Sequence, residues 1–241
     1  MCTVTLTSLN TAKCFVLSSN RDEASNRETL APKSYYEEGV KMMFPKDVSA
    51  GGTWLGISEK RRVICLLNGG FKNHVRKPPY RMSRGVVVKK FLAEDNFSEA
   101  LKNFNFFGIE PFTMIVAEWG RKISFSEVVW DGDQLHLKAL SPEKPHIWSS
   151  SPLYTSEAKT LREEWFLKLQ QENELSPENL LNFHSSAGKG DRNIGVIMDR
   201  GFVKTRSISQ VIVSEEKADF YYRDLETEEV SKKSFLKDQR K

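Results

Sequence analysis

The sequence predicts an α+β protein in which mostly antiparallel strands form hairpin clusters separated by helical blocks. Two observations lead to this class. Short runs of alternating or β-branched residues recur in pairs around turn signals, and amphipathic helical segments lie between these pairs. No Pro-, Gly- or Ser-rich linker interrupts the 241 residues. We therefore expect a single domain over residues 1–241 with a basic tail from about residue 230.

The first elements are predicted to be two strands joined by a turn. Residues 3–9 alternate between apolar and polar side chains, and residues 14–19 form a second β-rich run. The polar stretch NRDEASNRE (20–28) then ends the strand pattern, and a loop with two prolines follows. After it, residues 53–58 and 63–67 predict a second hairpin around the charged turn EKRR.

The rest of the chain alternates between helical and extended patterns. The spacing of apolar residues predicts one helix over 84–105, a long helix over 156–172 and a shorter one over 176–186. Strands are expected between and after these helices, at 112–119, 122–130, 134–140, 207–215 and 218–224. Loops around 24–48, 71–82 and 104–111 are expected to line the mouth of any pocket.

Composition narrows the class of protein. The chain is 39% hydrophobic and 28% charged, which is typical of a globular protein rather than a disordered or membrane one. No apolar run approaches the roughly 18 residues of a membrane span, and the N-terminus lacks a signal-peptide pattern, so a cytoplasmic location is expected. The formal net charge is only +4, and interspersed charges of this kind do not predict a nucleic-acid partner.

Cysteine and histidine usage predicts neither a disulfide framework nor a metal site. The three cysteines are too few and too scattered for a framework of disulfides. The four histidines share no metal-ligand spacing with them or with each other. We expect no metal and no bound cofactor on these grounds.

Cys2 is the first candidate for chemistry. If Met1 is removed, Cys2 carries both a thiol and a free α-amine. A cysteine thiolate is a strong nucleophile, and an α-amine titrates near pH 8, so one residue could supply nucleophile and base. On its own, a cysteine at position two is also an ordinary small residue entering a strand.

Two polar clusters could support such a nucleophile. The quartet Asn20-Arg21-Asp22-Glu23 follows the second predicted strand, where a carboxylate could orient the amine and a guanidinium could stabilise a thiolate. Asn68 ends the apolar run VICLL, and its amide could donate to a developing oxyanion. Taken alone, the quartet is more simply explained as a polar turn, and Asn68 is just as natural in an Asn-Gly turn.

Several motifs occur in order along the chain, namely MCTV, NRDE, GGTWLGIS, LLN, SRG and KTRS. Together they resemble the NRDE family, the proteins similar to transport and Golgi organisation protein 2. That family is in turn similar to N-terminal-nucleophile hydrolases of the bile salt hydrolase and penicillin V acylase type. The resemblance implies a four-layer αββα sandwich and cleavage of amide bonds by a cysteine exposed through removal of Met1.

Carried over residue by residue, the resemblance implies a catalytic set of four residues. Cys2 would be the nucleophile, and Asp22 would hold it. Asn68 would form the side-chain half of the oxyanion hole, and Arg206 would lie near the nucleophile. Four further residues are expected to contact the substrate: Asn20, Arg21, Trp54 and Ser151.

The chain departs from the hydrolase pattern at two places. The hydrolases carry an arginine three residues before the aspartate, where this chain has Ser19, and its Arg21 is adjacent to Asp22 instead. A shift of one position in a strand turns a side chain to the other face. In addition, Ser151 and Pro152 stand where the acylases have an Asn-Pro segment.

Two functions therefore remain open. The first is an amidohydrolase in which Cys2 attacks a C–N carbonyl of a small-molecule amide. The second is a non-catalytic protein that uses the same pocket to handle haem or a hydrophobic metabolite, since members of the resembled family are linked to haem trafficking and lipid metabolism. Neither the substrate nor the oligomeric state is predicted.

Overall fold

The computed structural model describes residues 3–9, 14–215 and 217–236. Within these residues the strands form two sheets, with six and seven strands, and the pairing is antiparallel throughout the seven-stranded sheet and from β10 to β12 in the six-stranded one. The α+β class with antiparallel sheets is confirmed. The elements are β1 (Thr3–Ser8), β2 (Phe15–Ala24), β3 (Thr29–Glu37), β4 (Val40–Asp47), β5 (Leu55–Ser58), β6 (Arg62–Asn68), α1 (Arg84–Ala93), α2 (Phe97–Asn103), β7 (Phe112–Glu118), β8 (Ser124–Trp130), β9 (Leu135–Leu140), β10 (His146–Ser149), α3 (Ser156–Glu172), α4 (Pro177–Ser186), β11 (Val203–Ser214), β12 (Lys217–Asp224) and β13 (Val230–Leu236).

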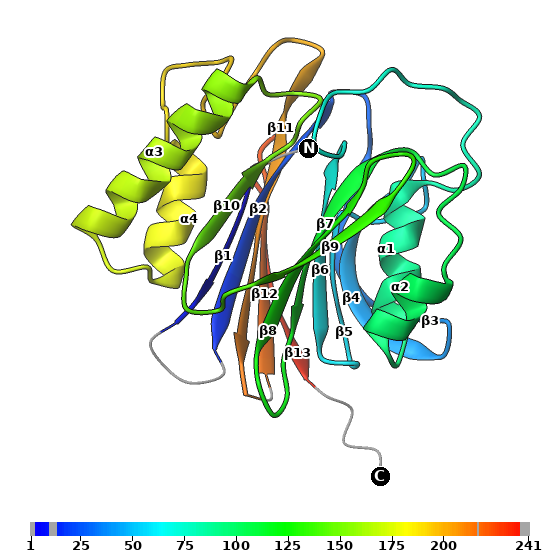
Figure 1. Cartoon of the computed structure of the whole chain (residues 1–241). Helices are drawn as coiled ribbons and strands as arrows, with labels where there is room; N and C mark the ends of the chain where they lie inside the picture. The colour runs from blue at the N-terminus through cyan, green and yellow to red at the C-terminus, as the bar shows by residue number, and fades with distance from the viewer. Residues whose placement is uncertain (1–2, 10–13, 216, 237–241) are drawn as a thin grey trace. The chain divides into compact units, whose positions relative to one another are not determined.

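The chain divides into two compact units (Figure 1). Unit 1 comprises Met1–Arg27 and Pro142–Ser234, and unit 2 comprises Glu28–Ser141 and Phe235–Lys241. Unit 1 holds helices α3 and α4 and the sheet ordered β10-β1-β2-β11-β12-β13, whereas unit 2 holds α1, α2 and the sheet ordered β3-β4-β5-β6-β7-β8-β9. That all of it forms one domain stays a prediction.

In unit 1, β2 is the central strand that carries the NRDE motif. It pairs with β1 on one side, where Val4 lies opposite Ser19, and with β11 on the other. Helices α3 and α4 cover one face of this sheet (Figure 1). Their apolar side chains form a core with Val16 of β2, whose other buried members are Phe166, Leu180, Phe183 and Val196.

In unit 2, two glycine motifs meet backbone to backbone. A Cβ atom on Gly52 would lie 2.4 Å from the carbonyl carbon of Gly85, and Thr53 N donates to Gly85 O at 3.2 Å. Gly85 is the second residue of α1, whose N-cap Ser83 accepts from Val86 N. The motifs GGTW and SRG therefore place the start of α1 directly on the segment that leads into β5.

Some element boundaries differ from the sequence-based expectation. The NRDE quartet does not end the second strand, because β2 continues to Ala24 and pairs with β11 along its whole length. The predicted loop over 24–48 is largely the β3–β4 hairpin. Pro32 falls where the register shifts between Leu30 and Lys33, on the edge strand of the sheet, which is a position that tolerates proline.

Three further elements also differ from the expectation. The single helix expected over 84–105 is two helices, since the side chain of Asn96 accepts from Glu99 N and caps a new helix. Strand β10 was not predicted. The residues 230–236, expected to begin a basic tail, form the edge strand β13 instead, and lysines such as Lys232 are common on edge strands.

Within the described residues, no helix has the length and hydropathy needed to cross a bilayer.

Candidate functional site

Asp22 lies near the end of β2, and its carboxylate is held by two hydroxyl groups. The side chain of Asp22 is only 1% exposed. Its Oδ1 accepts a hydrogen bond from Thr205 Oγ1 at 2.7 Å, and its Oδ2 accepts one from Tyr154 OH at 2.6 Å. Thr205 lies directly opposite Asp22 in the β2–β11 register. Hydroxyl donors at these short distances fix the orientation of both carboxylate oxygens.

A buried arginine supports this arrangement from helix α3. The guanidinium of Arg162 lies 3.6 Å from the centre of the Tyr154 ring, and Arg162 is fully buried. It donates to Thr3 Oγ1 at 2.6 Å and to the carbonyl oxygens of Ile194 and Gly195. Arg162 therefore connects the first described residue of β1 with the tyrosine that binds Asp22.

Tyr154 remains a hydrogen-bond donor in this environment. Burial, together with the negative charge of Asp22, raises the pKa of Tyr154 well above its usual range. The protonated phenol can therefore donate to Asp22 across the physiological pH range. Thr155 follows Tyr154 and caps α3 by accepting from Ala158 N, which fixes the turn that carries the tyrosine.

A second buried polar chain lies on the helix-covered face two residues before Asp22, as expected for alternate residues of a strand. Asn20 donates through Nδ2 to His184 O and Val196 O. Its Oδ1 accepts from His184 Nδ1, so His184 Nε2 is the acceptor for the hydroxyl of Thr5 at 2.8 Å. Burial, and to a lesser degree the charge of Arg162, lowers the pKa of His184 from 6.5 to about 3.

The remaining residues predicted in unit 1 make other contacts. Arg21 is buried, and its guanidinium lies 3.8 Å from the carboxylate of Glu23. Arg206 occupies the register shift between Thr205 and Ser207, donates to Ser25 O at 2.9 Å and pairs with Glu226. The hydrogen bond to Asp22 thus comes from Thr205, the residue before the predicted arginine.

Two further predicted residues belong to unit 1. Ser151 is half-buried in the turn after β10. Cys2 lies outside the described residues, and the described strand begins immediately after it at Thr3.

Asn68 and Trp54 belong to unit 2. Asn68 is the last residue of β6, is half-buried, and lies opposite Phe112. The following Gly69 has φ +83°, a conformation that glycine adopts without strain. Trp54 is 2% exposed, and its carbonyl accepts from Leu66 N at 2.7 Å.

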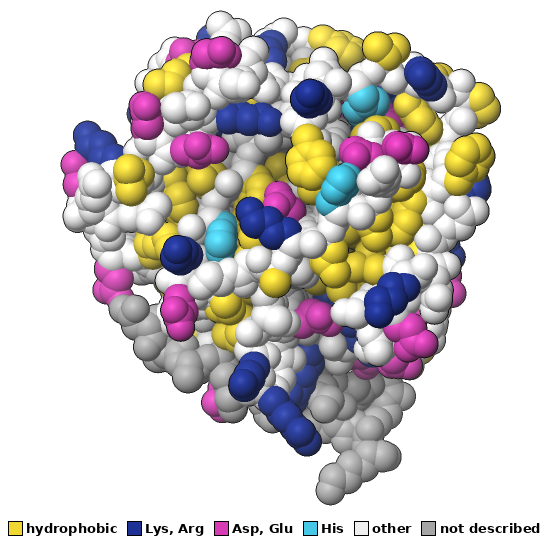
Figure 2. Space-filling model, in the orientation of Figure 1, with side chains coloured by type: hydrophobic (Ala, Val, Ile, Leu, Met, Phe, Trp, Pro, Cys, Tyr) yellow, Lys and Arg dark blue, Asp and Glu magenta, His cyan; other side chains and the backbone are white. Residues whose placement is uncertain are grey.

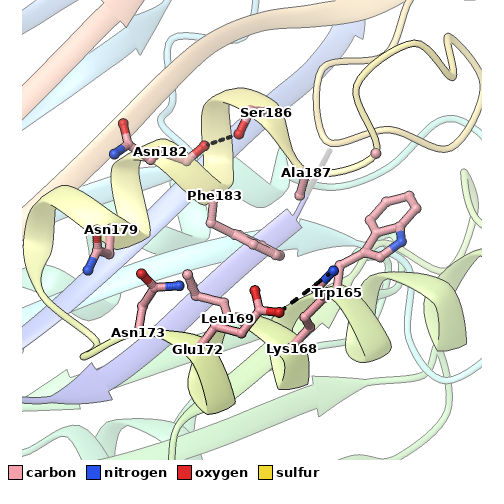
Figure 3. A pocket seen from close by; sticks show the side chains of 11 residues that line it. Trp165, Lys168, Leu169, Glu172, Asn173, Asn179, Asn182, Phe183, Ser186 and Ala187 are labelled. Atoms are coloured by element: carbon pink, nitrogen blue, oxygen red, sulfur yellow. Dashed lines mark hydrogen bonds and ion pairs between the residues drawn. The ribbon is translucent and has the colours of Figure 1, made fainter.

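A separate cavity of about 460 Å³ lies in unit 1 between α3 and α4 (Figure 3). Trp165, Leu169 and Phe183 supply its apolar surface. Its rim is polar, with an ion pair of 3.8 Å between Lys168 and Glu172. None of its lining residues is among those predicted from the motifs, so it is distinct from the Asp22 cluster.

Among the described residues, no group of three or more His, Cys, Asp and Glu side chains could hold a metal ion.

Sequence reasoning missed the residues that hold Asp22. Tyr154 and Arg162 lie in no motif, and they reach the site only because α3 packs on the sheet. Thr205 could have been predicted, since it stands inside the KTRS motif. A strand that pairs with NRDE must turn either Thr205 or Arg206 toward the aspartate.

Solved structures with a similar fold include proteins named as a hydrolase, an amidase and an acylase. A mutant of the conjugated bile acid hydrolase from Clostridium perfringens aligns with TM-score 0.55 and 11% identity, over 100% of this chain and 94% of that one. A Caenorhabditis elegans ortholog of N-acylethanolamine-hydrolyzing acid amidase aligns with TM-score 0.60 and 11% identity, over 87% and 92%. Penicillin V acylase from Agrobacterium tumefaciens gives TM-score 0.52 and 11% identity, over 96% and 85%. The chain therefore has a hydrolase-like fold of the N-terminal-nucleophile type.

The chain belongs to the Transport and Golgi organisation 2 family, whose model matches residues 1–222. Both the family and its relation to N-terminal-nucleophile hydrolases, inferred above from the motifs, are confirmed. No curated protein matches the chain.

Proposed function

We propose that the chain is an N-terminal cysteine hydrolase that cleaves a C–N amide bond of a small molecule. The observation that carries this proposal is the buried carboxylate of Asp22, oriented by Tyr154 and Thr205 on the strand next to β1. A buried carboxylate is costly unless it is hydrogen-bonded, and the two hydroxyl donors keep Asp22 in one orientation, which suits it to hold a reacting group in place. The fold is shared with three enzymes named for amide or acyl chemistry.

The reaction begins with Cys2 once Met1 has been removed. The α-amine takes the thiol proton, and the thiolate attacks the amide carbonyl carbon to form a tetrahedral intermediate. The C–N bond then breaks, the amine product leaves with the proton, and a thioester to Cys2 remains. Water, deprotonated by the same α-amine, attacks the thioester and releases the carboxylic acid and the free thiol.

The other residues have supporting roles in this proposal. In this proposal Asp22 also accepts a hydrogen bond from the α-amine of Cys2 and holds that amine in place as a base. The amide of Asn68 stabilises the oxyanion. Arg206, through Ser25 and Glu226, fixes the end of β2 that follows Asp22. Asn20, Arg21, Trp54 and Ser151 shape the surroundings of the substrate.

A covalent probe tests the proposal on the whole chain. Intact-mass spectrometry should first show loss of Met1, since retention of Met1 excludes a free α-amine on Cys2. A β-lactam or activated acyl-amide probe should then add one acyl group to the wild-type protein and none to Cys2→Ala. Cys14→Ala is the matched control, because Cys14 is also a free cysteine and is partly exposed.

Three outcomes distinguish the functions. Labelling that persists in Cys2→Ala contradicts a nucleophilic Cys2. Labelling that disappears in both variants points to a general loss of structure, which circular dichroism detects. An inert thiol combined with a saturable one-to-one titration by haem supports the ligand-handling function in place of the hydrolase.

A further inference from the structure

The loop between β6 and α1 concentrates positive charge. We refer to residues 71–81 as the basic loop. It carries Lys72, Arg76, Lys77 and Arg81, and no Asp or Glu occurs from residue 69 to residue 93. The whole chain has a formal net charge of only +4, so this concentration creates a local positive potential rather than reflecting a uniformly basic surface.

The same loop exposes large apolar side chains. Phe71 is 57% exposed and Val75 is 81% exposed. On the adjacent segment before β7, Phe107 is 82% exposed. Figure 2 shows hydrophobic side chains protruding at the upper right, where Figure 1 draws the loop that follows β6. A single exposed apolar residue is ordinary, but several beside a cluster of cations mark an interaction surface.

Hydrogen bonds join the basic loop to the segment that carries Phe107. Arg81 N donates to Gly108 O at 2.8 Å, and Arg81 Nε donates to Phe107 O at 3.0 Å. Nearby, Glu110 binds His74 at 3.2 Å and Arg76 at 3.1 Å. These contacts hold the basic loop beside the segment that carries Phe107, and both belong to unit 2.

Most of the positive charge on this surface is not neutralised within the protein. Glu110 is shared by His74, Arg76 and Arg84. Lys72 and Lys77 form no ion pair with any described residue. Arg81 directs its guanidinium to backbone carbonyl oxygens, which carry no formal charge. The cations therefore remain available for an anionic partner.

We propose that the basic loop and Phe107 form a docking surface for an anionic lipid bilayer. Lysine and arginine side chains are attracted to the phosphates of acidic lipids, and exposed phenylalanine and aliphatic side chains insert into the headgroup region. A free phosphate or a nucleic acid would engage the cations but would leave the aliphatic Val75 without a role. A neutral hydrophobic protein partner would leave Lys72 and Lys77 without a role in binding.

Vesicle flotation with the full chain tests this assignment. Wild-type protein should float with vesicles of phosphatidylcholine and phosphatidylglycerol, should not float with phosphatidylcholine alone, and should bind more weakly as salt is raised. The double variant Lys72→Glu/Lys77→Glu should bind the anionic vesicles at least about tenfold more weakly. The variant Val75→Ser/Phe107→Ser, which keeps every charge, should also lose most of its binding.

Matched controls alter equivalent exposed residues elsewhere. Lys122→Glu/Lys144→Glu changes the net charge by the same amount, and Phe202→Ser removes a phenylalanine that is 68% exposed. Both should bind anionic vesicles as the wild type does, and circular dichroism should show every variant folded. Absence of wild-type binding, or equal loss in the charge controls, overturns the proposal. Unchanged binding by Val75→Ser/Phe107→Ser shows a site for anions alone and also overturns it.

Discussion

At the scale of single residues, successive side chains of the NRDE motif point to opposite faces of β2. Asn20 contacts His184 of α4, and Asp22 contacts Tyr154, in the turn before α3, and Thr205 of the neighbouring strand β11. Arg21 lies between them in sequence, so it projects to the opposite face of the strand, where its guanidinium approaches Glu23. The motif is therefore a strand end with two different faces rather than a polar turn.

Removal of one hydroxyl tests how strongly Asp22 is held. In Tyr154→Phe the buried carboxylate loses a donor at 2.6 Å, and a hydrogen bond to a charged group contributes about 1.5–3 kcal/mol. We expect the free energy of unfolding to fall by about that amount in urea denaturation. If the proposed function holds, acylation of Cys2 should also slow, because Asp22 would be less well oriented.

Tyr36→Phe is the control for this substitution. Tyr36 is 68% exposed, so loss of its hydroxyl should change the free energy of unfolding by less than about 0.5 kcal/mol. Equal stability of wild type and Tyr154→Phe would show that Tyr154 does not support the carboxylate.

At the scale of elements, close approach of two glycines explains why GGTW and SRG occur together. In Gly52→Ala, the added methyl group would lie 2.4 Å from the backbone of Gly85, which no side-chain rotation can relieve. Overpacking of this kind costs about 1–3 kcal/mol or more. We expect Gly52→Ala to lower the free energy of unfolding by at least that amount, measured by chemical denaturation.

Gly120→Ala controls for the general effect of replacing glycine. An added Cβ at Gly120 meets only the end of the Arg61 side chain, at 3.8 Å. This variant should therefore be about as stable as the wild type. Similar destabilisation by both substitutions would contradict the importance of the Gly52–Gly85 contact.

Strand ends and edges were the elements hardest to predict. Strand β10 contains only four residues, His146–Ser149, and all of them are partly buried. It becomes a strand because it pairs with the edge of β1, where Ser149 lies opposite Thr3 and His146 lies opposite Leu6. Long buried strands such as β7 were predicted correctly. Six of the seven residues of β7 are buried, and a strand of this kind stands out in the sequence as a mostly apolar run.

At the scale of the whole molecule, His184 makes folding sensitive to acid. It connects α4 with β1 and β2, and its pKa is lowered from 6.5 to about 3 by burial and by Arg162. The unfolded chain therefore binds a proton between these values while the folded chain does not. Stability must fall as the pH drops below 6.5 and level off near 3, which amounts to about 2 kcal/mol between pH 7 and pH 5.

Two measurements check this dependence. Urea denaturation from pH 7 to pH 5 should show the expected loss, and His184→Gln, if folded, should show a correspondingly smaller one. NMR titration of the wild-type protein needs no variant, and the ring of His184 should not titrate above about pH 4. A ring pKa near 6.5 would contradict the prediction.

The family, the antiparallel α+β class and the positions of the long strands and helices could be predicted from the amino-acid sequence, because periodicity and ordered motifs are local properties of the chain. The sequence also singled out Asp22. The partners of Asp22 became known from the folded structure alone, since Tyr154 and Thr205 come from a turn and a strand more than 130 residues along the chain, and Arg162, which stacks on Tyr154, comes from helix α3. Whether Thr205 or Arg206 faces the carboxylate depends on a register shift in β11, and register is fixed by pairing between distant strands rather than by the local sequence.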